Sequence, residues 1–139
     1  MSLYRCLPKA TGHRGISSSL LSSGHVNPYV RVYLYDGVTG KNCAKLLHST
    51  APVDRNGLNP VWDTDKEFEV AVERPSIAVI LFAVWDKRSD GSSDFIAGAA
   101  VPVSCMREGY RSVSLYDSLH TKLGPFSFAS LFVRAQKIS

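Results

Sequence analysis

Three aspartates follow one another at four-residue intervals, Asp86, Asp90 and Asp94, and they are the clearest candidates for chemistry in the sequence. Calcium is a hard cation that takes about six to eight oxygen ligands, so carboxylates gathered in one loop are the donors that it needs. The spacing differs from that of an EF-hand loop. Asp, Ser and Gly are also ordinary turn residues, so the stretch indicates either a calcium loop or a plain turn.

The sequence motifs of common enzymes are missing. There is no glycine-rich phosphate loop, no His-Glu-x-x-His and no Gly-x-Ser-x-Gly, and the histidines have no ligand spacing. The cysteines form no Cys-x-x-Cys pair, which argues against a zinc or redox site. They are Cys6, Cys43 and Cys105. We interpret them as reduced thiols of a cytosolic protein.

Short strands are expected to position this loop. Alternating apolar and polar residues predict strands over residues 29–36 and 67–72. Residues 77–85 are apolar on both faces, as expected of a central strand, and further strands are expected over residues 95–103, 110–115 and 126–135. Gly and Pro turn signals separate them. Residues 104–108 are expected to form one helical turn that is capped by Ser104 and ended by Gly109. About eight short strands indicate an all-β antiparallel sandwich.

Composition describes an ordinary small globular protein. The chain has 139 residues, of which 45% are hydrophobic and 20% charged, so one domain is expected. No stretch is long enough for a membrane-spanning helix, and the N-terminus does not resemble a signal peptide. The net charge of +4 suits a surface that meets anionic lipid, although many inert proteins share it. Basic residues do not interleave with aromatics, so we expect no nucleic-acid partner.

Residues 10–26 differ from the rest because they are rich in Ser and Gly and contain no acidic residue. One interpretation is a disordered surface loop. The other is an apolar tip, formed by Ile16, Leu20 and Leu21 beside the basic Arg14, that inserts at a lipid interface.

Several stretches resemble the C2 domain, a calcium- and lipid-binding β-sandwich. They are Asn27-Pro-Tyr-Val30, Asn56-Gly-Leu-Asn-Pro-Val-Trp62, Phe68-Glu-Val70 and the loop of residues 86–96. Residues 99–115, with the triplet Gly109-Tyr-Arg111, and residues 129–133 are similar to the C-terminal C2 domain of phosphoinositide-specific phospholipase C. The resemblance implies a single C2 domain over residues 1–139, with eight strands, the permuted phospholipase-type topology and a short first strand.

The resemblance also implies a parent enzyme that is a phosphodiesterase. Its catalytic barrel needs about 250 residues, so we expect this chain to be a module without catalytic activity. The implied partners are the anionic phospholipid surface and the catalytic domain of the parent phospholipase. The implied setting is the cytoplasm, with a monomer attached peripherally to the membrane.

The calcium pattern of that family is degenerate here. In the third loop the family has aspartates where this chain has Asp86, Arg88 and Asp94, and in the first loop Asn27 replaces another. Asp90 is an irregular extra candidate. Two unit charges ~4 Å apart interact by about 4 kcal/mol at an effective dielectric constant of about 20, so an arginine there opposes a cation strongly. We therefore expect weak or absent calcium binding, with the Arg88 guanidinium between Asp86 and Asp94 in place of the ion.

Lipid binding does not require the ion. We expect the basic residues of the loop end to attract anionic lipid, each by about 1 kcal/mol, with the apolar tip beside them. The lipid-binding candidates are Lys9, Arg14, Leu20, Leu21, Lys87 and Arg88. The alternative is a C2 scaffold whose lipid site has decayed and which packs against its own enzyme or a protein partner. Arg31, Lys41 and Lys45 are a further candidate basic patch.

Overall fold

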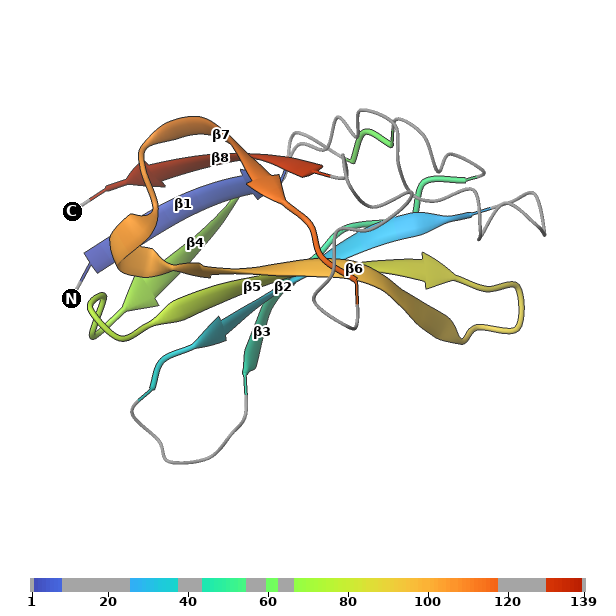
Figure 1. The fold of residues 1–139 in the computed structure, drawn as a ribbon, viewed down its shortest axis with the longest axis horizontal. Coiled ribbons are helices and arrows are strands. Elements are labelled where there is room, and N and C mark those ends of the chain that lie inside the picture. Colours follow the sequence, from blue (N-terminus) through green and yellow to red (C-terminus); the bar gives the residue numbers. More distant parts are fainter. Residues whose placement is uncertain are drawn as a thin grey trace.

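The computed structural model describes residues 2–8, 26–37, 44–54, 60–62, 67–117 and 130–138, with the backbone alone for residues 2–8. In this part of the chain, two four-stranded antiparallel sheets face each other (Figure 1). The first sheet has the order β4-β1-β8-β7, formed by Phe68–Val72, Ser2–Pro8, Ser130–Lys137 and Gly109–Ser114. The second has the order β3-β2-β5-β6, formed by Lys45–Ser49, Pro28–Tyr35, Val79–Lys87 and Ser93–Pro102.

The predicted all-β sandwich is confirmed, and most predicted strands lie within two residues of the observed ones. The strand β3 was not predicted individually. Residues 126–129 of the last predicted strand lie outside the described residues, and β8 continues to Lys137. The predicted helical turn is wrong in its start: a 3-10 helix covers Val103–Cys105, and Ser104 lies inside it without capping it. The turn starts earlier because Val103 is buried and its backbone amide donates to the Ala78 carbonyl at 2.9 Å.

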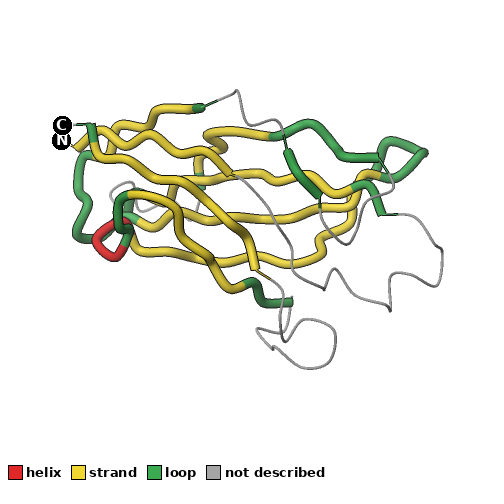
Figure 2. The backbone as a smooth tube through the Cα atoms, turned by 90° about the horizontal axis from the view of Figure 1, so that it is seen from above, coloured by secondary structure: helices red, strands yellow, loops and turns green. Residues whose placement is uncertain are grey.

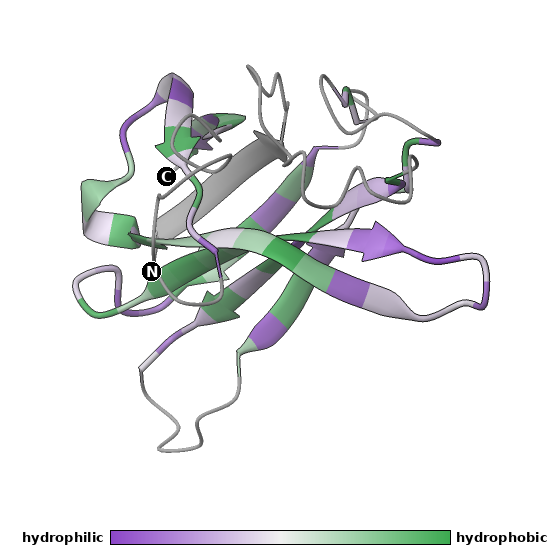
Figure 3. Ribbon diagram, turned by 45° about the vertical axis from the view of Figure 1, so that its right-hand side comes forward, coloured by the Kyte–Doolittle hydropathy of each residue, from purple (hydrophilic) through white to green (hydrophobic). Residues whose placement is uncertain are grey.

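The core lies between the two sheets. Alternate side chains of the strands face inward and are buried, and Figure 3 shows the same alternation of apolar and polar residues along the second sheet. The buried residues include Val30, Val32, Ile80, Phe82, Val84, Leu131 and Val133. Full burial of such a side chain contributes about 1.5–3 kcal/mol. Trp62 is 2% exposed, and its indole N–H donates to the Pro28 carbonyl at 2.9 Å.

The hairpin of β5 and β6 positions the aspartate loop. The two strands pair in register from Val79 and Pro102 to Lys87 and Ser93, with one irregularity between Val84 and Trp85. Figures 1 and 2 both place the turn of this hairpin at one end of the sandwich and the chain termini at the other. Among the residues that the structure describes, no helix has the length and apolar character needed to cross a membrane.

Candidate functional site

The turn between β5 and β6, with the strand residues that flank it, forms a closed loop of residues 87–94, which we call the hairpin tip. The Arg88 amide donates to the Ser92 carbonyl at 2.9 Å, and the Gly91 amide donates to the Arg88 carbonyl at 3.1 Å. Gly91 has φ +89°, a conformation that a side chain would strain. These bonds fix the backbone from which the candidate ligands project.

Asp90 is engaged inside the hairpin tip. Its Oδ1 accepts hydrogen bonds from the Ser92 amide at 2.8 Å and from the Ser92 hydroxyl at 2.5 Å. Both bonds lower the pKa of Asp90 below the ordinary value, and the bond from the Ser92 hydroxyl has the larger effect. Asp90 therefore acts as a turn residue, which is the plainer of the two interpretations of this aspartate.

Asp86 joins the hairpin to the start of β2. Its Oδ1 accepts a hydrogen bond from the Asn27 backbone amide at 2.9 Å, and the Asn27 side-chain amide donates to the Lys87 carbonyl at 3.1 Å. The Lys87 amide donates in turn to the Asn27 carbonyl at 3.0 Å. The structure thus brings Asn27 and Asp86 together as the family pattern implies, but the Asp86 carboxylate is bound to a backbone amide.

Arg88 forms an ion pair with Asp94, through Nη2 and Oδ2. We expected the guanidinium between Asp86 and Asp94, but the contact described for it is with Asp94, and Asp86 is bound to Asn27. The two side chains of the pair are 57% and 44% exposed. An exposed pair of this kind contributes about 0–1 kcal/mol. The Lys87 ammonium group donates to the Gly91 carbonyl at 3.0 Å, so both basic side chains turn back onto the hairpin.

The described residues do not fit a calcium site. Within them, no three His, Cys, Asp or Glu side chains gather closely enough to hold a metal ion. The Arg88 guanidinium is paired with Asp94, and one oxygen of each of the other two carboxylates, Oδ1 of Asp86 and Oδ1 of Asp90, already accepts hydrogen bonds within the protein. Weak or absent calcium binding stays a prediction, now with a geometric reason.

Four of the six lipid-binding candidates lie outside the described residues. They are Lys9, Arg14, Leu20 and Leu21. The other two, Lys87 and Arg88, are neighbours at the hairpin tip. Of the further basic patch, Lys41 is also outside the description, Lys45 lies on β3, and Arg31 lies on β2.

Arg31 belongs to an aromatic cluster on the outer face of the second sheet. Its guanidinium carbon lies 5.3 Å from the centre of the Tyr29 ring and 5.6 Å from that of Trp85. The Trp85 ring meets Phe95 edge-on at 5.5 Å. The sequence indicated that Arg31 faces outward, but the cluster depends on the pairing of Tyr29 with Trp85 across two strands. The sequence of either strand alone does not indicate that these two residues pair.

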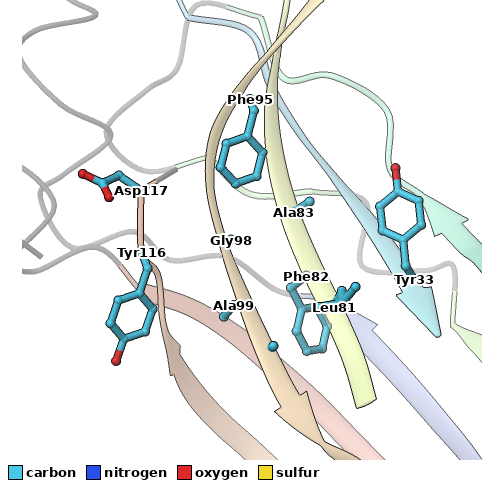
Figure 4. A pocket seen from close by; sticks show the side chains of 10 residues that line it. Tyr33, Leu81, Phe82, Ala83, Phe95, Gly98, Ala99, Tyr116 and Asp117 are labelled. Atoms are coloured by element: carbon cyan, nitrogen blue, oxygen red, sulfur yellow. The ribbon is translucent and has the colours of Figure 1, made fainter. Parts of the chain in front are cut away.

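An apolar groove of about 620 Å³ lies beside this cluster, and sequence reasoning missed it. Figure 4 shows the aromatic rings around small residues of β5 and β6. It is lined by Tyr33, Leu81, Phe82, Ala83, Phe95, Gly98, Ala99, Ala100, Tyr116 and Asp117. A side chain does not fit at Gly98, because its Cβ atom would lie 2.9 Å from the Phe82 carbonyl oxygen and 3.2 Å from the Phe95 ring. The segment after β7 closes one side, since Gly98 and Tyr116 exchange two backbone hydrogen bonds of 2.9 Å.

Comparison with known proteins gives a consistent picture. The sequence matches the C2 domain family over residues 9–118. It is 38% identical over 90 residues to human 1-phosphatidylinositol 4,5-bisphosphate phosphodiesterase delta-1, covering 65% of this chain and 11% of that protein. It is 33% identical over 108 residues to the delta-4 protein of Pongo abelii, covering 78% of this chain and 13% of that protein. The chain therefore spans only about a tenth of these curated relatives.

Solved structures share the fold. A C2 domain of plant Extended Synaptotagmin 1 superposes with a TM-score of 0.68 at 21% identity, covering 98% of this chain and 92% of that one. S. officinalis PLC21 superposes with a TM-score of 0.66 at 23% identity, covering all of this chain and 16% of that one.

Proposed function

This chain belongs to the C2 domain family, and we propose that it is the C2 module of a phosphoinositide-specific phospholipase C that docks on anionic phospholipid without calcium. The family match supports the module, and the names of the similar phosphodiesterases support the parent. In this proposal, lipid hydrolysis belongs to the remainder of the parent protein, on the cytoplasmic surface of the membrane, and the module acts as a monomer.

The observation that carries the calcium-independent form is the position of Arg88. Its guanidinium brings a fixed positive charge to Asp94, one of the two carboxylates that match the family's calcium pattern. A calcium ion would have to displace this charge or bind beside it, and either costs binding free energy. The hairpin tip presents two cationic side chains, Lys87 and Arg88, beside the carboxylates of Asp90 and Asp94, so its formal charge is zero. Docking through the tip therefore depends on these two cations meeting lipid phosphates, from a backbone that is ordered by its own hydrogen bonds.

The expected affinity is low. Each basic residue near an anionic leaflet contributes about 1 kcal/mol, and salt screens it over about 8–10 Å. Lys87 and Arg88 together therefore contribute about 2 kcal/mol. A module tethered to a larger protein gains from the other contacts of that protein, so weak docking is sufficient.

Vesicle co-sedimentation in the presence of a chelator tests this proposal. Binding to vesicles of phosphatidylserine and phosphatidylcholine is expected at low salt and should be lost at high salt. The double variant Lys87→Gln, Arg88→Gln is expected to bind at least tenfold more weakly, from the loss of about 2 kcal/mol. The double variant Arg107→Gln, Lys137→Gln removes the same two charges away from the hairpin tip, so it is the matched control and should bind as the wild type does. Equal binding by the double variant and the wild type would contradict docking through the hairpin tip.

The second candidate function is a scaffold that packs on its own enzyme or on a protein partner, and the groove favours it. Phe95 and Tyr116 on its lining are 40% and 38% exposed, and apolar surfaces that exceed scattered single residues mark interaction sites. Ala100→Arg would place a charge in the groove. If the scaffold is the function, this variant separates the module from the rest of its parent protein in a pull-down while vesicle binding stays unchanged. Unchanged association would argue against the scaffold.

A further inference from the structure

The two basic side chains of the hairpin tip have different binding partners. The two cationic groups there are bound differently: Lys87 to a neutral carbonyl of Gly91, and Arg88 to the negative carboxylate of Asp94. Resting on the proposed docking function, we infer that Asp94 is a built-in restraint on membrane binding. It holds Arg88 until an anionic lipid phosphate takes the place of its carboxylate.

The backbone sets both ends of this restraint. Asp94 lies on β6 directly opposite Asp86, and Arg88 follows the last pair of the hairpin, where its amide is bound to Ser92. The guanidinium therefore reaches Asp94 across the mouth of the tip without rearrangement of the backbone. Because both side chains are about half exposed, a phosphate can approach the guanidinium without unfolding any part of the hairpin.

The chemistry of the exchange is balanced, since one anion replaces another. Guanidinium groups form the same paired hydrogen bonds with carboxylates and with phosphates. Asp90 interacts with Arg88 through charge and its Oδ1 accepts the two Ser92 donors, whereas Asp94 is in direct contact with the guanidinium. An exposed ion pair is weak, so the restraint reduces affinity by up to about fivefold and does not abolish binding. Such a restraint favours membranes of high anionic density over sparse ones.

The experiment compares two variants of equal charge. Asp94→Asn removes the restraint, whereas Asp90→Asn changes the net charge by the same amount, leaves the ion pair intact and keeps an acceptor for Ser92. Both are measured for binding to vesicles of phosphatidylserine and phosphatidylcholine in chelator at low salt, with thermal unfolding as a check on the fold. We expect Asp94→Asn to bind up to about fivefold more tightly than Asp90→Asn. Equal gains by the two variants would overturn the restraint.

A third variant separates this inference from the proposed function. In an Arg88→Gln background, Asp94→Asn should add only the gain seen for Asp90→Asn, because no guanidinium is left to release. A full extra gain in that background would show that Asp94 acts through charge alone and would overturn the restraint. If Arg88→Gln itself leaves vesicle binding unchanged, docking through Arg88 fails, and the restraint fails with it.

Discussion

The hairpin tip and the groove are built on the same two strands, yet they offer opposite chemistry. At the tip, charged side chains are held by exposed hydrogen bonds and an ion pair between residues at most six positions apart. In the groove, apolar side chains from β2, β5, β6 and the segment after β7 meet over Gly98. An exposed ion pair is weak, so an anion from outside can replace one of its partners. An exposed apolar surface is typical of a site that a binding partner buries. The tip therefore suits reversible docking on lipid, and the groove suits a protein partner.

The largest expected difference between the two regions is in stability. Phe82→Ala removes a core side chain, 1% exposed, from a residue at the floor of the groove, so it should lower the free energy of unfolding by about 3–5 kcal/mol. Arg88→Gln breaks only an exposed ion pair and should cost less than about 1 kcal/mol. Urea unfolding of both variants measures this. Similar losses would mean that the tip is integral to the fold and is not free to exchange its contacts.

The second-largest expected effect is a gain of calcium dependence in vesicle binding. Arg88→Asp restores the family pattern of three third-loop carboxylates beside Asn27, so it should make vesicle binding depend on calcium. We expect at least tenfold tighter binding of this variant in millimolar calcium than in chelator. Lys87→Asp carries the same change of charge outside the pattern and should stay insensitive to calcium. If both variants respond alike to calcium, residue 88 is not a position of the calcium pattern.

The smallest effect is the pH dependence of Asp90. Its pKa is lowered in the folded state, so the charged form contributes stability above the ordinary carboxyl pKa, and this is lost as the pH falls through the folded pKa. Asp90→Ala should therefore unfold at a slightly lower temperature than the wild type near pH 6. The gap should close as the pH falls below the ordinary carboxyl range. A gap that widens in acid would contradict the role of the Ser92 bonds.

Local pattern explains which parts were predictable from the sequence. Alternation identified β2, because Val30 and Val32 face the core, and a continuous apolar run identified β5 as a central strand. Alternation did not single out β3, where Leu46 and Leu47 are adjacent and the pairing with β2 shifts register.

The candidate site was likewise predictable only where its residues are close in sequence. The aspartate loop was visible because its residues are close in sequence. The bond between Asn27 and Asp86 joins residues that are 59 positions apart, and the groove depends on a bridge between Gly98 and Tyr116. These arrangements follow from the register of the sheets, which the local pattern of one strand does not specify.

The decisive measurement is the binding of the wild-type chain to phosphatidylserine vesicles with millimolar calcium and with chelator, at the same ionic strength. If the guanidinium of Arg88 has replaced the ion, the two binding curves will coincide, and both will weaken together as salt is raised. Binding that appears only with calcium would show that Asp86, Asp90 and Asp94 hold the ion despite Arg88, and it would contradict the proposed mode of docking.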